Sequence, residues 1–266
     1  MVHVEFMGIP GSGKSTVRSL LLESLNRQKI PCLSMEQALL SSLKANVDGI
    51  LFKCLLRMLP ANMALKYAPL VFTRSALRYA AQNAFLSTHG KSVSTVLSSD
   101  YFLQAAPSER ETVLSRFLLT ASQYQLIREH AAEYSPVLFD EGFLQKSASL
   151  FVSPGEKTLP DTAFLSSYLD IIPRPDIVLY LQTDVKTCME RIIARPKGMP
   201  ERLVGRNRQE IQSYLEANDS FIQSIAELAN TKDYYVGVIE NNGSPEEVVS
   251  RLQRVIQGYH FPTERA

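Results

Sequence analysis

The segment that most constrains this chain is the glycine-rich octapeptide at residues 8–15, which reads Gly-Ile-Pro-Gly-Ser-Gly-Lys-Ser. It matches the pattern G-x-x-x-x-G-K-[ST], in which glycines let successive backbone N–H groups turn inward around phosphate oxygens. A short apolar run precedes it at residues 2–7, and a helical pattern follows at residues 15–28. This order predicts that the loop and the positive end of the helix bind the phosphates of a nucleotide.

Two residues of the loop have expected chemical roles. Lys14 is expected to reach the β- and γ-phosphates as a catalytic cation, and the Ser15 hydroxyl is expected to bind Mg²⁺. We expect Lys14 to be solvated in the free protein and the nucleotide to be ATP, although the residues do not distinguish ATP from GTP. The alternative is a chance match in a glycine-rich turn. The residues predicted to contact the nucleotide are Gly8, Pro10, Gly11, Ser12, Gly13, Lys14, Ser15 and Thr16.

Length and composition favour one α/β domain over residues 1–266, because 45% of the residues are apolar. The three cysteines (Cys32, Cys54 and Cys188) are isolated and the four histidines do not cluster, which argues against a metal–thiolate site or a disulfide framework. No apolar stretch reaches the roughly 20 residues of a membrane span, and no signal peptide precedes the glycine loop. We therefore expect a soluble, cytoplasmic protein.

Four further apolar runs are predicted to be strands, at residues 30–35, 137–140, 176–181 and 235–240. Helical patterns lie between them, so the strands are expected to form a parallel sheet covered on both faces. Residues 37–134 are mostly helical in pattern and too long for a simple crossover, which predicts a helical insertion beside the site. Its breaks are expected at Pro60, Pro69, Gly90 and Pro107.

The predicted strand at residues 137–140 ends in two acids, Asp140 and Glu141. Asp140 is expected to hold Mg²⁺, because a hard cation prefers carboxylate oxygen; the alternative is an acid that caps the next turn. Arg191 and Arg195 lie four residues apart on one helical face, and Arg206 follows in a basic loop. Such guanidinium groups can stabilise the charge on a transferring phosphoryl group, although a solvated basic face has the same pattern.

Together these features resemble the thymidylate kinase and deoxynucleoside kinase group. The resemblance rests on the phosphate loop, the strand ending at Asp140, the strand at 175–181, the helix of Arg191 and Arg195, and the arginine-rich segment before Glu210. It covers most of the chain except the insertion. It implies a three-layer P-loop fold with a five-stranded parallel sheet of order 2-3-1-4-5. It also implies a mobile lid at about 195–209 and transfer of the γ-phosphoryl group of ATP to an acceptor.

Two residues depart from that group on the acceptor side. Thymidylate kinases have an arginine for the acceptor phosphate where Glu141 stands, and another where Gln123 stands. Two missing cations and one additional anion disfavour a monophosphate acceptor in a poorly screened cleft. We therefore expect a neutral or cationic acceptor, such as a sugar, a nucleoside or another alcohol. Glu36 resembles the general base of the deoxynucleoside kinases; the alternative is an ordinary solvated glutamate.

The predicted insertion has an uneven charge balance. Between residues 37 and 99, seven basic residues stand against Asp48 alone. This balance suits a surface for an anionic partner, namely nucleic acid, membrane lipid or a phosphorylated glycan, but also an amphipathic helical subdomain with a solvated outer face. A homodimer is left open as well. The basic residues are Lys44, Lys53, Arg57, Lys66, Arg74, Arg78 and Lys91.

Two functions besides phosphotransfer remain open on the sequence. The Asp140-Glu141 pair also matches ATPases in which the glutamate activates water. The basic insertion would suit a non-catalytic nucleotide-binding adaptor for nucleic acid or membrane. Phosphotransfer to a small molecule is favoured because we find no further ATPase signature.

Overall fold

The computed structural model describes residues 1–46, 59–131, 136–153, 159–195 and 198–259. Its central feature is a five-stranded sheet in which every neighbouring pair of strands is parallel. The strand order β2-β3-β1-β4-β5 confirms the order expected from the resemblance. The strands are β1 (Val2–Met7), β2 (Leu33–Ser34), β3 (Pro136–Phe139), β4 (Ile177–Gln182) and β5 (Val236–Glu240).

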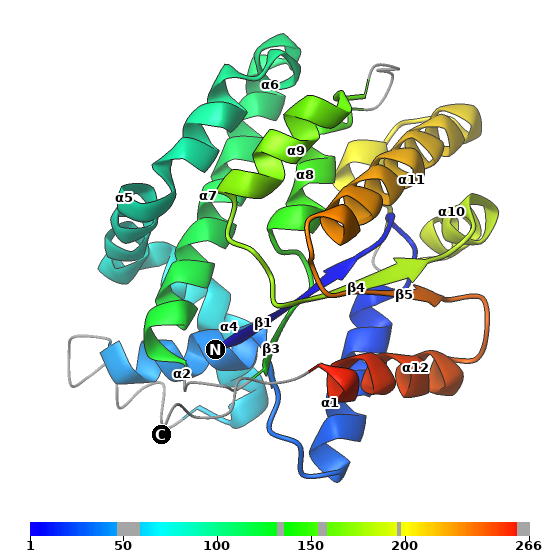
Figure 1. The fold of residues 1–266 in the computed structure, drawn as a ribbon. Coiled ribbons are helices and arrows are strands. Elements are labelled where there is room, and N and C mark those ends of the chain that lie inside the picture. Colours follow the sequence, from blue (N-terminus) through cyan, green and yellow to red (C-terminus); the bar gives the residue numbers. More distant parts are fainter. Residues whose placement is uncertain (47–58, 132–135, 154–158, 196–197, 260–266) are drawn as a thin grey trace.

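Helices cover both faces of the sheet, which gives three layers (Figure 1). The helices are α1 (Lys14–Arg27), α2 (Met35–Asn46), α4 (Ala61–Arg74), α5 (Ala76–Ser98), α6 (Asp100–Gln104), α7 (Pro107–His130), α8 (Phe143–Phe151), α9 (Thr162–Ile171), α10 (Val185–Ile193), α11 (Arg208–Thr231) and α12 (Pro245–Gly258). On one face, α1 and α12 bury Leu21, Leu25 and Leu252 against the strands. The opposite face is covered by helices that include α7, α8, α9 and α11. In the described part of the chain, no helix combines the length and the hydropathy of a transmembrane span.

The strand β1 lies at the centre of the sheet, between β3 and β4, and all six of its residues are buried. Because side chains alternate along a strand, Val4 and Phe6 contribute to the core beneath α1 and α12, while His3 and Glu5 point to the other layer. There the His3 ring packs against Tyr124 of α7. The phosphate loop begins directly after β1, at the carboxyl edge where open parallel sheets bind their ligands.

The second strand is shorter than predicted. Apolar residues suggest a strand over 30–35, but β2 is only Leu33–Ser34. Lys29 has a left-handed φ of 59°, and Pro31 lacks the N–H group that a ladder needs. Met35 already begins α2, so β2 has no room to extend.

The insertion is helical over its described residues, but one of its predicted breaks is wrong, because Pro69 lies inside α4. The break predicted at Gly90 corresponds to a kink in α5 at the neighbouring His89, which has non-helical dihedral angles (φ −123°, ψ 23°). The helices instead end at Ser75 and Ser99, which have extended backbones. Pro60 and Pro107 do precede or begin helices, as proline's fixed φ favours. Lys53, Arg57 and Asp48, which enter the predicted charge balance, lie outside the described residues.

The segment between β3 and β4 contains two helices, α8 and α9, whose bounds were not predicted from the sequence. The predicted lid at 195–209 contains a short 3-10 turn, Glu201–Leu203, followed by Asn207 as the N-cap of α11. Residues 196–197 of that lid lie outside the described residues. Both differences matter for the site, because α8 and the lid residues line it.

Candidate active site

The phosphate loop has the backbone that its sequence predicts. Gly11 and Gly13 have left-handed φ values of 85° and 86°, which glycine adopts without strain. A Cβ on Gly11 would lie 2.4 Å from the Cys188 carbonyl oxygen of α10, so no larger residue fits there. The first turn of α1 has no side-chain cap and no acidic residue, which leaves its N–H groups to bind an anion.

Lys14 is folded back onto the loop and is not the solvated residue that we expected. Its Nζ atom donates to the carbonyl oxygens of Gly8 at 2.6 Å and Ile9 at 3.2 Å, and its side chain is half-buried. Burial lowers the pKa of Lys14, while the negative charges of Asp140 and Glu141 oppose that shift. The ammonium group is therefore held at the loop by the loop's own carbonyl groups.

Ser15 and Asp140 meet at the end of β3. The Ser15 Oγ atom donates to Asp140 Oδ2 at 2.8 Å, and the other carboxylate oxygen, Oδ1, is buried without a hydrogen-bond partner. A hydroxyl and a carboxylate oxygen are the hard ligands that Mg²⁺ prefers beside phosphate oxygens and water. These two residues fit a magnesium ion. The described residues contain no cluster of three or more His, Cys, Asp or Glu side chains suited to a metal.

The phosphate loop opens into a cleft of about 460 Å³ between α8, α10 and the lid residues. Five of the seven residues predicted to be catalytic line this cleft: Lys14, Asp140, Glu141, Arg191 and Arg195. The loop residues that line it are Pro10, Gly11, Gly13, Lys14, Ser15 and Thr16. The remaining predicted contacts, Gly8 and Ser12, are buried beneath the loop.

The other two predicted catalytic residues, Glu36 and Arg206, are not among the described residues that line the cleft. Both Glu36 carboxylate oxygens accept hydrogen bonds from Arg18 of α1, at 3.0 and 3.1 Å. Burial would raise the pKa of Glu36, but the Arg18 charge and the hydrogen bonds outweigh it, so that this pKa is lowered. The exposed Arg206 guanidinium lies 3.3 Å from Glu210 on the first turn of α11.

Three ion pairs lie at the cleft and the smaller cavity beside it. Lys146 of α8 pairs with Glu141, Arg116 of α7 lies 2.5 Å from Glu201, and Arg202 lies 3.3 Å from Glu109. Burial would raise the pKa of Glu141, but Lys146 outweighs it and lowers that pKa. A smaller cavity of about 80 Å³ is lined by the cationic members of all three pairs and by Glu141. Gln123, where the family has an arginine, is buried and does not line the cleft or this cavity.

Residues that the sequence pattern missed hold the loop in place. The Gln145 Oε1 atom accepts from the Gly8 N–H at 2.9 Å, and Asn241 Nδ2 donates to the Ser12 carbonyl oxygen at 2.5 Å. The Gln145 N–H in turn donates to Glu5 Oε1 at 2.7 Å. A Cβ on Gly142 would lie 2.3 Å from Glu5 Oε2, so this glycine lets the start of α8 approach the buried carboxyl group.

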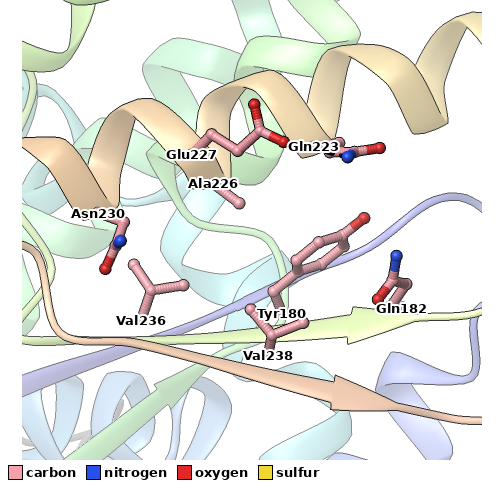
Figure 2. Close-up of a pocket in the computed structure, with 8 residues that line it drawn as sticks. All are labelled: Tyr180, Gln182, Gln223, Ala226, Glu227, Asn230, Val236 and Val238. Atoms are coloured by element: carbon pink, nitrogen blue, oxygen red, sulfur yellow. Dashed lines mark hydrogen bonds between the residues drawn. The ribbon is translucent and has the colours of Figure 1, made fainter.

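A second cavity, of about 290 Å³, lies between α11 and the strands β4 and β5 (Figure 2). Tyr180, Gln182 and Val238 form its floor, and α11 residues such as Gln223 and Glu227 form its other side. None of the residues lining it belongs to the phosphate loop, to Asp140-Glu141 or to the lid arginines. The residues predicted from the sequence therefore gather at the cleft beside the loop and not at this second cavity.

No protein-family model matches the chain. No curated protein matches it either. Among solved structures, the chain is similar to a deoxyadenosine kinase from M. mycoides with dCMP and dCDP bound, at 14% identity and a TM-score of 0.47. The same kinase with bound dCTP gives 13% identity and a TM-score of 0.46. Each comparison covers 96% of this chain and 98% of the other. The assignment of the fold rests on the sheet order and the phosphate loop.

Proposed function

We propose that this protein transfers the γ-phosphoryl group of ATP, with Mg²⁺, to a hydroxyl group of a small, uncharged acceptor. The observation that carries the proposal is the convergence in one cleft of the phosphate loop, the Ser15–Asp140 pair and the two arginines Arg191 and Arg195. Each supplies one requirement of phosphoryl transfer, namely phosphate binding, metal binding and stabilisation of equatorial charge.

The loop and its lysine bind the triphosphate. The open N–H groups at the start of α1 donate hydrogen bonds to phosphate oxygens, and Lys14 exchanges the carbonyl oxygens of Gly8 and Ile9 for the β- and γ-phosphates. When bound, Mg²⁺ neutralises charge on the β- and γ-oxygens. Asp140, whose Oδ1 atom is buried without a partner, and Ser15 are the residues that would hold it.

The two arginines are the proposed charge-stabilising groups. Arg191 Nη1 lies 3.7 Å from where a Cβ on Gly13 would be, so this guanidinium already borders the phosphate loop. Arg195 lines the same cleft just beyond the end of α10. Because phosphoryl transfer proceeds through a loose transition state, positioned cations contribute more to the rate than a strong base does.

A neutral acceptor fits the part of the cleft beside the three ion pairs, because the charges there are already compensated. Lys146, Arg116 and Arg202 each have an acidic partner, so an additional phosphate would have to displace one of these carboxylates. Those carboxylates and cations can instead hydrogen bond to hydroxyl groups, as a sugar, a nucleoside or another polyol requires. The structure therefore supports a neutral acceptor for a different reason than the sequence does. Cations are present in this part of the cleft but are paired with acids, whereas the sequence suggested that cations were missing.

We assign the carboxylate that receives the acceptor proton to Glu141 rather than Glu36. Glu141 lines the cleft beside Asp140, whereas both oxygens of Glu36 are bonded to Arg18. Glu141→Gln should therefore lower turnover more than Glu36→Gln does.

The test is an acceptor screen that measures ADP release with nucleosides, nucleoside monophosphates, sugars and phosphorylated glycans, each with ATP and Mg²⁺. We expect release that depends on a neutral hydroxyl compound, with little activity on dTMP. Efficient phosphorylation of dTMP would refute the acceptor class, and equal release without any acceptor would favour the hydrolase.

A further inference from the structure

The helix α4 presents large apolar side chains to solvent. Met63, Tyr67 and Leu70 follow one another at intervals of four and three residues, and 42%, 40% and 47% of their respective surfaces are exposed. The opposite side of the same helix, which includes Ala68 and Phe72, is fully buried. The packing of α4 is therefore complete without the three exposed residues, and they form an apolar stripe along its outer face.

Basic residues lie on the same stripe. Lys66 and Arg74 are exposed and fall on the helical face of Met63, Tyr67 and Leu70. We call these five residues the α4 face. Residues 59–99 contain no acidic residue, and they include two further cations, Arg78 and Lys91 of α5, besides Lys66 and Arg74. Among the described residues, none of these four cations forms an ion pair.

The start of α5, which follows α4 directly, also has an exposed aromatic side chain beside a basic one. Tyr79 is 62% exposed, and the Arg78 guanidinium lies 5.8 Å from the centre of its ring. In Figure 1, α5 lies on the opposite side of the molecule from α10, which borders the nucleotide cleft. None of the described residues of α4 lines the cleft, so the α4 face is separate from it.

We propose that the α4 face docks on a membrane surface that contains anionic lipids. Apolar side chains enter the headgroup–acyl boundary, tyrosine rings lie at the interface, and lysine and arginine bind lipid phosphates. The formal net charge of the whole chain is only +1, so attraction to an anionic surface has to come from a local patch such as this one.

Two other partners fit the α4 face less well. A second copy of the chain, related by two-fold symmetry, would bring the same basic patch of both copies together, and residues 59–99 supply no acid to compensate it. Nucleic acid would pair with the cations but would leave Met63 and Leu70 against a charged backbone. A lipid surface, in contrast to these two partners, offers anions and an apolar layer together.

The experiment measures co-flotation of the full chain with vesicles of phosphatidylcholine alone or with about one third phosphatidylserine. We expect binding to the anionic vesicles alone, weakened by salt because exposed charges are screened. Each charge removed should cost about fivefold in partition, so K66Q/R74Q should bind about 25-fold more weakly. Y67S/L70S should lose binding as well, since part of the affinity comes from apolar burial.

The matched control is R251Q/R254Q, which removes the same charge from exposed positions of α12. It should bind the vesicles within twofold of wild type, and far-UV circular dichroism should show every variant folded. If R251Q/R254Q lost as much vesicle binding as K66Q/R74Q does, the net charge of the protein would explain the binding, and the proposal would be overturned. The proposal would also fail if K66Q/R74Q bound like wild type, if phosphatidylcholine alone sufficed, or if the α4 face mediated dimerisation or RNA binding instead. None of these outcomes depends on phosphotransfer.

Discussion

Replacing Glu5 by Gln should change how the stability of the protein depends on pH. Glu5 lies on β1 beneath the start of α8, and its Oε2 atom is buried without a hydrogen-bond partner. Burial raises the pKa of Glu5 from its ordinary 4.5 to about 8, although the N–H groups of α8 and the Lys146 charge oppose that shift. The carboxyl group is therefore neutral in the folded protein near neutral pH.

The sign of the effect follows from proton linkage. Above pH 4.5 the unfolded chain releases the Glu5 proton while the folded protein keeps it, so stability falls as pH rises until the folded group ionises at about 8. His3 acts in the opposite direction, because burial lowers its pKa from 6.5 to about 3 and stability is lost as pH falls below 6.5. Between pH 6.5 and 8, Glu5 is the one of these two residues that still makes the free energy of unfolding depend on pH. At 1.36 kcal/mol per pH unit, the free energy of unfolding falls by about 2 kcal/mol over this range.

Urea unfolding at about pH 6.5 and pH 8 measures this difference. The wild-type free energy of unfolding should fall by about 2 kcal/mol between the two, and that of Glu5→Gln should change by less than about 0.5 kcal/mol. Glutamine keeps an acceptor for the Gln145 N–H group, so the variant should fold. Equal pH slopes in the two proteins would refute the burial argument for Glu5.

Two predictions concern the cleft. Asp140→Asn should raise the Mg²⁺ concentration needed for half-maximal activity and lower turnover by orders of magnitude, because it removes a carboxylate ligand; a wild-type Mg²⁺ titration would make Asp140 structural. Arg191→Ala or Arg195→Ala should keep near-normal ATP affinity and lose turnover more than a hundredfold, since an arginine at the transferring group contributes about 10³–10⁵. Arg206→Ala should stay within about fivefold, as expected for an exposed ion pair with Glu210, and a large loss there would return Arg206 to the catalytic set.

The sequence predicted those parts of the fold in which the local pattern and the tertiary environment agree. Four of the six residues of β1 are apolar and the glycine loop follows directly, so the strand and its end could be predicted, although the burial of His3 and Glu5 could not. The position of Asp140 at the end of β3 followed from the same reasoning. The extent of β2 did not, because Lys29, Pro31 and the early start of α2 limit it locally.

The rest of the site depends on contacts between residues far apart in the chain. Gln145 accepts a hydrogen bond from Gly8, which is 137 residues away in the sequence, and no pattern in the α8 segment indicates this contact. The pairing of Glu36 with Arg18 likewise depends on the placement of the start of α2 beside α1, which cannot be read from the sequence around Glu36. Lys146 lies five residues after Glu141, and its role required knowing that a helix begins between them.

The central claim is that phosphate leaves ATP for an acceptor in this cleft, and the distribution of a γ-³²P label tests it directly. Wild-type protein, ATP, Mg²⁺ and a neutral hydroxyl acceptor found in the screen should yield the label on the acceptor, with one ADP for each label transferred. Lys14→Met should reduce the transfer by at least about 10²–10³, because it removes a cation placed at the reacting phosphates. Label that appears only as inorganic phosphate, or transfer that Lys14→Met leaves unchanged, would contradict the account.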